Sequence, residues 1–272
     1  MHSKQANGNA STVALTELKE IVSKKSLFFI FDRDGTLVPF SDSPELAVID
    51  PTVQSTLNEL VVSCNAQVAI VSARGLSSLA NEFEPNNLIL AGNYGLEISF
   101  PSGKRFLHSA AVSALSEMIE LEDMLTVIVA RECGLILDRH KYSLCLHFHK
   151  LPSHKHNKLH LLIQKLSQSF PTLFCRRLST SYEFLPPCKW DKSNAIDEIV
   201  EQISPRETPF FVVFGDSEAD EPMYSWVNKH NGLSFNIGSK VSSNARVRLH
   251  SPEELRTLLL TVLECYKANH AI

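Results

Sequence analysis

The chain has 272 residues, of which 44% are hydrophobic and 21% charged, as expected for a globular protein of about two domains. Its formal charge of −4 gives no electrostatic reason to expect nucleic acid or an anionic membrane as a partner. No segment approaches the roughly eighteen consecutive apolar residues of a membrane-spanning helix. The six scattered cysteines, without a Cys-x-x-Cys pair, indicate reduced thiols in a cytoplasmic protein.

Helical and strand-like patterns alternate along the first third of the chain and return near its end. Residues 15–25 have helical apolar spacing, and "PTVQSTLNELVVS" predicts a second helix. Short apolar runs predict strands at 26–31, 67–72, 87–92 and 209–216. This alternation predicts an α/β fold, with a Rossmann-like parallel sheet joined by right-handed crossovers.

The middle third of the chain has a different pattern. A helix over 110–132 precedes two strand-like stretches within 135–149, and the amphipathic helix 154–170 precedes two more, "LFCRRL" and "SYEFLP". Hairpins rather than crossovers connect such strands, which predicts an α+β unit. We therefore expect an inserted cap domain at 102–184 within an α/β core formed by 1–101 and 185–272.

Polar side chains follow the predicted core strands at the point where each strand ends. The carboxyl ends of parallel strands lie at one edge of a sheet, where active sites form. The residues that this places at one edge are Asp32, Asp34, Ser72, Arg74, Asp216 and Asp220, joined by Lys192 at the start of a helix.

These residues suit phosphoryl transfer. Asp32, Asp216 and a backbone carbonyl near Asp34 are hard oxygen ligands for Mg²⁺. The Asp32 carboxylate can attack phosphorus to form an aspartyl-phosphate, while Asp34 protonates the leaving alkoxide and later deprotonates the attacking water. Ser72 and Lys192 can stabilise the phosphoryl oxygens. Asp220 is expected to orient Lys192 or a metal-bound water rather than to bind metal directly.

The same residues resemble the four motifs of the haloacid-dehalogenase-like hydrolases. Asp-x-Asp-Gly-Thr-Leu follows an apolar strand, Ser follows the second strand, and a Lys and Gly-Asp-x-x-x-Asp come later, in that order over residues 28–220. The long insertion between Ser72 and Lys192 resembles the type with a large α/β cap. Within that superfamily, "DRDGTLVPF", "VSARG", "AGNYGLEI", "SLCLHFH", "YEFLP" and "GDSEADEPMY" look most like trehalose-6-phosphate phosphatases.

That resemblance implies Mg²⁺-dependent hydrolysis of a phosphorylated disaccharide, most of all trehalose 6-phosphate. Within the same chemistry, another sugar phosphatase or a glycosyl-glycerate phosphatase is the alternative. A catalytically silent sugar-phosphate-binding module and a phospho-receiver module are alternatives from other classes.

Several positions depart from the family pattern without touching the residues assigned to phosphoryl transfer. Tyr94 stands where the family has His, His149 and Leu185 where it has Arg, Ser217 where it has Asp, and Ser193 where it has Gly. Some of these positions are expected to contact sugar hydroxyls from the cap or its hinges. The resemblance therefore supports the reaction more strongly than the sugar.

The candidates for contacting the substrate lie mostly on the cap and its hinges. They are Arg74, Asn93, Glu97, Lys141, His149 and Glu183. Glu97 and Glu183 match family positions and could accept hydrogen bonds from sugar hydroxyls, the alternative being exposed strand carboxylates. Arg74 could instead form a local ion pair. His147, His149, His156 and His160 could suggest a zinc site, but the sequence offers no Cys or carboxylate to complete the set.

Overall fold

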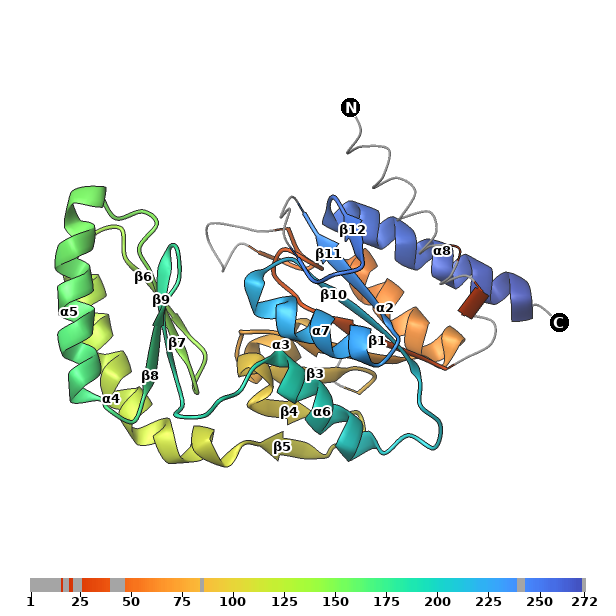
Figure 1. The fold of residues 1–272 in the computed structure, drawn as a ribbon, viewed down its shortest axis with the longest axis horizontal. Helices are drawn as coiled ribbons and strands as arrows, with labels where there is room; N and C mark the ends of the chain where they lie inside the picture. Colours follow the sequence, from red (N-terminus) through yellow and green to blue (C-terminus); the bar gives the residue numbers. More distant parts are fainter. Residues whose placement is uncertain are drawn as a thin grey trace.

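The protein is described here by a computed structural model that covers residues 16, 20–21, 26–39, 47–83, 86–238 and 243–270. Two separate β-sheets organise this part of the chain, one of eight strands and one of four. Figure 1 shows the smaller sheet and its helices as a lobe beside the larger one. The helix predicted at 15–25 lies mostly outside the described residues, which include only Thr16, Glu20 and Ile21 of it.

The large sheet forms the centre of the larger lobe. It is parallel from β12 to β3, and β4 and β5 extend it in antiparallel orientation. In spatial order its strands are β12 (Val247–Leu249), β11 (Leu233–Ile237), β10 (Phe210–Gly215), β1 (Leu27–Phe31), β2 (Gln67–Val71), β3 (Ile89–Gly92), β4 (Glu97–Ser99) and β5 (Arg105–Leu107). The predicted α/β class with a mostly parallel sheet is confirmed.

Helices cover both faces of this sheet, which explains why β1 is apolar throughout. Phe29 packs in one core cluster with Leu57 of α2 and Leu259 of α8, whereas Phe28 packs on the opposite face with Ile196 of α6. Side chains alternate between the faces of a strand, so both must be apolar when both are covered. The helices of this lobe are α2 (Pro51–Cys64), α3 (Leu76–Glu82), α6 (Lys192–Ile203), α7 (Glu221–Lys229) and α8 (Pro252–His270).

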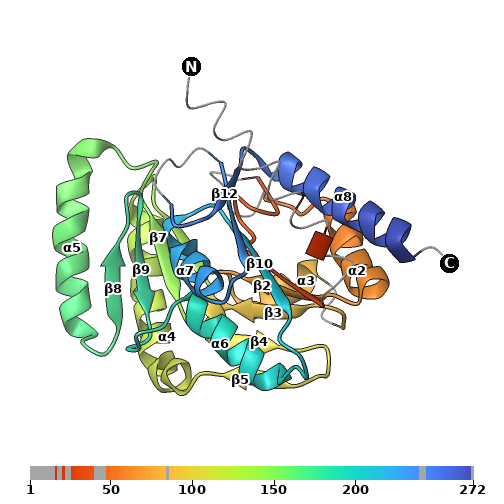
Figure 2. The ribbon, with the colours of Figure 1, turned by 45° about the vertical axis from the view of Figure 1, so that its right-hand side comes forward.

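The small sheet is antiparallel throughout and carries two helices on its outer side, away from the large sheet (Figures 1 and 2). Leu146 and Phe184 pack against these helices in one apolar core, so the alternate residues of the same strands face the larger lobe. The elements are α4 (Ser109–Arg131), β6 (Ile136–Arg139), β7 (Leu144–His147), α5 (His156–Ser169), β8 (Phe174–Arg177) and β9 (Ser181–Leu185), in spatial strand order β6-β7-β9-β8.

This order of elements matches the inserted α+β unit predicted from the sequence. Strand β5 falls inside the range 102–184 predicted for that unit, yet it pairs with β4 in the large sheet. We therefore propose that the inserted unit begins after Leu107, with α4. Among the described residues, no helix has both the length and the apolar character needed to cross a membrane.

Candidate active site

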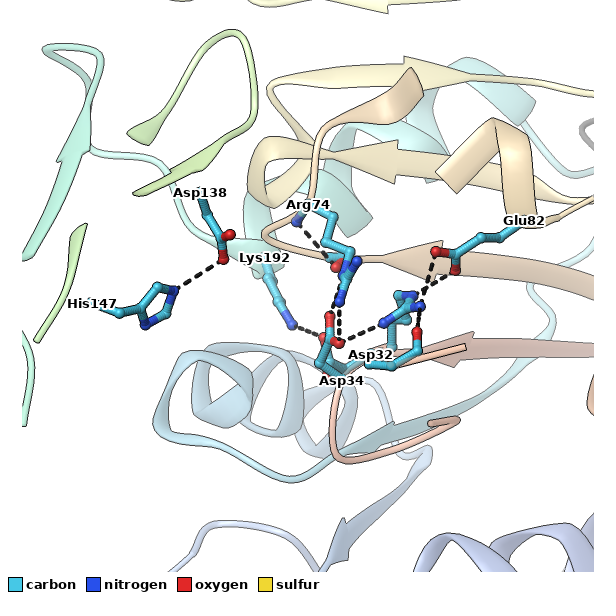
Figure 3. Close-up of polar contacts among 10 residues, drawn as sticks. Asp32, Asp34, Arg74, Glu82, Asp138, His147 and Lys192 are labelled. Atoms are coloured by element: carbon cyan, nitrogen blue, oxygen red, sulfur yellow. Dashed lines mark hydrogen bonds and ion pairs between the residues drawn. The ribbon is translucent and has the colours of Figure 1, made fainter. Parts of the chain in front are cut away.

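Asp32 lies directly after β1, at the carboxyl edge of the large sheet. Its backbone N–H donates to the carbonyl of Phe214 on β10 (2.9 Å), which extends the ladder one residue beyond β1. Lys192 reaches the same edge because it is the first residue of α6, whose amino end is capped by Asp191. The Lys192 Nζ atom donates to Asp32 Oδ1 (2.5 Å; Figure 3). It also donates to Asp220 Oδ1 (2.6 Å), so one buried ammonium joins two buried carboxylates.

Asp220 links Lys192 to the loop that follows β10. It is fully buried, and its Oδ2 atom accepts from the backbone N–H groups of Asp216 (3.0 Å) and Ser217 (2.9 Å) and from the Ser217 hydroxyl (2.9 Å). One carboxylate thus fixes both the ammonium and the loop that carries Asp216. These contacts are the ones expected of a residue that orients Lys192.

Asp216 lies against the turn that follows Asp32. A Cβ atom at Gly35 would overlap the Asp216 carboxylate, and Gly35 itself has a φ of +82°. A glycine is therefore required here for two reasons, because other residues rarely adopt this φ and because the carboxylate occupies the space of a side chain.

Asp32, Asp216 and Asp220 could hold a metal ion. Each offers an oxygen atom, and these atoms lie within 4.8 Å of one another. Burial and repulsion among the carboxylates raise the pKa of Asp32 to about 7 and that of Asp216 to about 8, although Lys192 opposes both shifts. A bound cation would relieve this repulsion, and carboxylate oxygens are ligands that hard divalent cations prefer. The carboxylate oxygens at this site therefore fit a divalent metal ion.

Asp34 also lies at the carboxyl edge of the large sheet, where two arginines bind its side chain. Arg74 binds it with Nε–Oδ2 and Nη2–Oδ1 distances of 2.8 and 2.9 Å. Arg33 also donates to Asp34 Oδ1 (2.5 Å) and pairs with both oxygens of Glu82 at 2.7 and 2.9 Å. Figure 3 shows the Asp34 side chain beside Arg74. These side-chain contacts do not test the predicted metal-binding role of Asp34, which was assigned to its backbone carbonyl.

Ser72 follows β2, beside Asp32, as expected from the order of the strands. Its backbone N–H donates to the carbonyl of Ala91 on β3 (3.0 Å), and the side chain is buried. The hydroxyl accepts from the backbone N–H of Arg74 (3.2 Å). The large sheet therefore brings the four predicted catalytic residues, Asp32, Asp34, Ser72 and Lys192, to one edge.

Asn93 and Glu97, predicted to contact substrate, are bound to other parts of the protein. Asn93 is fully buried, and its Nδ2 atom donates to Glu97 Oε1 (2.7 Å) and to the carbonyl of His140 (2.8 Å). Its Oδ1 atom accepts from the hydroxyl of Ser143 (2.7 Å). The same Glu97 oxygen accepts from the N–H of Leu76 at the start of α3 (2.7 Å). Substrate contact by either residue stays a prediction.

The three cap residues predicted to contact substrate have different surroundings. Glu183 is buried on β9, on the strand face directed toward the larger lobe, and binds Tyr94 and Arg176. Lys141 is exposed in the β6–β7 turn, with its Nζ atom 4.9 Å from the centre of the Tyr142 ring. His149 is exposed after β7. Their contact with substrate also stays a prediction.

The structure adds a pair that the sequence reasoning missed. Asp138 of β6 binds His147 of β7 (Oδ2···Nε2, 3.0 Å), and Figure 3 shows this pair on the cap side of the rim, across from Arg74. Burial alone would lower the pKa of His147, but hydrogen bonds to Asp138 and Cys145 raise it to about 10. The spacing of Asp138 and His147 in the sequence gives no sign of this contact, which depends on the strand register.

The cap histidines considered as a zinc site have other partners. His156 Nε2 is 2.9 Å from the carbonyl of Leu151, and His160 Nδ1 is 3.0 Å from the hydroxyl of Tyr182. Within the described residues, the three aspartates above form the only group of His, Cys, Asp or Glu ligand atoms close enough to hold a metal.

Comparisons with known proteins agree with this geometry. The chain is 27% identical over 229 residues to a probable trehalose-phosphate phosphatase from Sinorhizobium fredii, which covers 84% of both chains. Two Mycobacterium tuberculosis proteins described as uncharacterized glycosyl hydrolases are 25% identical over 221 residues, and the match spans only 16% of their length.

Solved structures show the same fold. A trehalose-6-phosphate phosphatase related protein superposes with a TM-score of 0.76 at 19% identity, over 88% of this chain and 97% of the other. A haloacid dehalogenase-like hydrolase from Bacteroides thetaiotaomicron superposes with a TM-score of 0.60 at 14% identity, over 88% of this chain and 99% of the other. The sequence model of the family described as Trehalose-phosphatase matches residues 30–258. The chain therefore belongs to the trehalose-phosphatase family of phosphoric monoester hydrolases, within the haloacid-dehalogenase-like fold.

Proposed function

We propose that this protein is a Mg²⁺-dependent phosphatase that hydrolyses trehalose 6-phosphate to trehalose and phosphate. The observation that carries the proposal is the buried contact of Lys192 with Asp32 and Asp220, beside Asp216, at the carboxyl edge of the parallel sheet. The family match and the name of the Sinorhizobium relative support the choice of substrate.

The first half of the reaction is assigned to Asp32 and Asp34. An Asp32 carboxylate oxygen attacks phosphorus as the bond between phosphorus and the sugar oxygen breaks, which forms an aspartyl-phosphate. The leaving sugar oxygen takes a proton from Asp34. Lys192 and the Ser72 hydroxyl lie at the same edge and stabilise the negative charge on the phosphoryl oxygens.

In the second half, Asp34 takes a proton from a water molecule, and the resulting hydroxide attacks phosphorus. The bond between phosphorus and Asp32 breaks, so phosphate leaves and both aspartates return to their starting forms. Asp34 must enter the first half protonated, so its pairing with both Arg74 and Arg33 must loosen. A substrate phosphate can compete with Asp34 for the Arg74 guanidinium.

Asp32, Asp216 and the backbone carbonyl near Asp34 are the proposed metal ligands, with Asp220 holding the loop of Asp216. Mg²⁺ bound there would reduce the repulsion between a carboxylate nucleophile and an anionic phosphoryl group. We further infer a cytoplasmic location, because all six cysteines are free thiols.

The test is phosphate release from trehalose 6-phosphate with and without Mg²⁺, by the wild type and by Asp32→Asn. Activity should require Mg²⁺ and vanish in the variant, because an amide is a far poorer nucleophile than a carboxylate. Peptide mapping after acid quenching during turnover should find phosphate on the peptide that contains Asp32. As a matched control, Asp197→Asn alters an exposed aspartate bound to Trp226 and should retain full activity. Full activity in Asp32→Asn would rule out the mechanism.

A second candidate is another sugar phosphatase or a glycosyl-glycerate phosphatase with the same catalytic residues. The observation that favours it is the set of departures from the family pattern at the cap and hinge, among them Tyr94 and His149. Values of kcat/KM for a panel of sugar phosphates distinguish the two candidates.

A further inference from the structure

The turn between β3 and β4 has an unusual backbone. Asn93, Tyr94 and Gly95 have successive φ values of +50°, +60° and +93°, and all three residues are buried. A residue other than glycine rarely adopts this conformation and does so only where its surroundings hold it. Here the surroundings include the small sheet.

Tyr94 reaches from this turn to Glu183 on β9. Its hydroxyl donates to Glu183 Oε1 (2.6 Å), while Arg176 Nε on β8 donates to Glu183 Oε2 (2.5 Å). The Arg176 guanidinium carbon also lies 5.2 Å from the centre of the Tyr94 ring. Glu183 is thus held from two sides, once by the large-sheet lobe and once by its neighbouring strand.

Burial makes this contact costly to open. The Glu183 side chain is only 9% exposed, and it accepts hydrogen bonds from Tyr94 and Arg176. A buried carboxylate that loses one partner keeps its desolvation cost without the compensating bond. The Tyr94 hydroxyl is the partner that comes from the other lobe.

A second contact joins the same turn to the β6–β7 turn, at the same end of the small sheet, since Glu183 pairs with Cys145, two residues after Ser143. Asn93 binds the hydroxyl of Ser143 (2.7 Å) and the carbonyl of His140 (2.8 Å), both in the β6–β7 turn. The turn at 93–95 therefore holds the small sheet at two places, one near β6–β7 and one on β9. Two contacts on neighbouring strands restrict the orientation of this end of the small sheet more than one contact would.

We propose that Tyr94 is a positioning residue for the reaction. By binding Glu183, it sets the orientation of the small sheet relative to Asp32 and Asp34 at the carboxyl edge of the large sheet. That orientation determines the space available to the leaving group. The family pattern has His at this position, so the orientation is set here by a different side chain. The proposal rests on the proposed phosphatase activity only for its kinetic readout.

The test compares Tyr94→Phe with Tyr182→Phe. Tyr182 is a matched control because it too has a hydroxyl partner, His160 (3.0 Å), and an arginine near its ring, Arg177 at 5.9 Å, but all three lie within the cap. Each variant is assayed with trehalose 6-phosphate and with p-nitrophenyl phosphate, a small aryl ester whose leaving group needs little of the cap.

For Tyr94→Phe, we expect KM for trehalose 6-phosphate to rise about 10-fold or more, because the variant loses one hydrogen bond to a charged group, Glu183. Turnover of the aryl ester should stay within about twofold of the wild type, because the catalytic aspartates are untouched. Tyr182→Phe should change neither. An equal loss on both substrates, or no change on either, would overturn the proposal.

Hydrogen exchange without substrate separates this proposal from the proposed function. Tyr94→Phe should speed exchange of the amides at 93–97 and 140–147, and Tyr182→Phe should leave them as in the wild type. If trehalose 6-phosphate is not hydrolysed but this difference is seen, the proposed substrate fails and the positioning role stands. Unchanged exchange in Tyr94→Phe would overturn the positioning role even in an active enzyme.

Discussion

The Arg74 guanidinium holds both carboxylate oxygens of Asp34, with Nε 2.8 Å from Oδ2 and Nη2 2.9 Å from Oδ1. The residue proposed to move protons is therefore bound to a cation that can also bind phosphate. We therefore expect the arrival of the substrate phosphate to release Asp34 from Arg74. This arrangement also predicts that Arg74 acts in catalysis rather than only in local packing.

Arg74→Gln tests this relationship. The variant loses the positive charge of Arg74 and its bidentate contact with Asp34. The value of kcat/KM for the sugar phosphate should therefore fall by roughly 10- to 100-fold, as expected for the loss of a hydrogen bond to a charged group. Arg139→Gln is the control, because Arg139 pairs with Glu122 on the cap surface (3.0 Å) and is 46% exposed. Unaltered kinetics in Arg74→Gln would assign Arg74 a structural role only.

Lys192 should be important for stability as well as for catalysis. Lys192→Met removes the ammonium between Asp32 and Asp220 and leaves two buried carboxylates without their cation. The free energy of unfolding should fall by about 3–5 kcal/mol, as when one partner of a buried ion pair is removed. Adding Asp220→Asn should restore part of that loss. Additive losses in the double variant, measured by denaturant unfolding, would contradict the coupling.

The close approach of Gly35 to Asp216 predicts a strong effect of a single methyl group. Gly35→Ala would force the Asp216 carboxylate to move, at a residue whose φ is +82°. Gly103→Ala provides a matched control, since Gly103 has a φ of +81° but no atom within 4 Å of the added Cβ. Both variants should lose about 1 kcal/mol or more from backbone strain. Only Gly35→Ala should lose Mg²⁺ affinity and activity; equal behaviour of the two would contradict the packing argument.

The raised pKa values of Asp32 and Asp216 predict how stability depends on pH. Their ordinary pKa is 3.8, and the folded protein raises them to about 7 and about 8. The folded state therefore binds more protons than the unfolded state across this interval, so the metal-free protein should lose stability as pH rises from about 4 to above 8. Asp216→Asn should flatten this dependence.

Added Mg²⁺ should act in the opposite direction, because it binds the deprotonated carboxylates. Its effect on Tm should be larger at pH 8.5 than at pH 5.5. A metal-free wild type whose Tm rises through this interval more steeply than that of Asp216→Asn would contradict the assignment.

The order of motifs in the sequence was enough to predict which side chains lie together at the carboxyl edge of the large sheet. Asp32, Ser72 and Asp216 each follow an apolar run, and parallel pairing brings such positions together whatever the details of the loops. The sequence also predicted the antiparallel strands of the small sheet, while the bounds of the inserted unit stay a prediction. It missed β4 and β5, which are only three residues long each, as well as β11 and β12 at the far edge.

Side-chain partners across the cap could not be read from the sequence. The contact of Glu183 with Arg176 depends on the β8–β9 register, and that of Asp138 with His147 on the β6–β7 register. The contact of Tyr94 with Glu183 joins residues 89 positions apart and depends on how the two sheets are oriented. Local patterns carry no information on these relationships, whereas strand ends are marked locally by a change from apolar to charged residues.

The most direct test of the proposed activity is kcat/KM for trehalose 6-phosphate within a panel of sugar and glycosyl-glycerate phosphates, using the wild type and Asp32→Asn with Mg²⁺ present. We predict that trehalose 6-phosphate has the highest value for the wild type and that no substrate is hydrolysed above background by Asp32→Asn. A higher kcat/KM for another phosphate would contradict the substrate, and wild-type turnover by Asp32→Asn would contradict the mechanism.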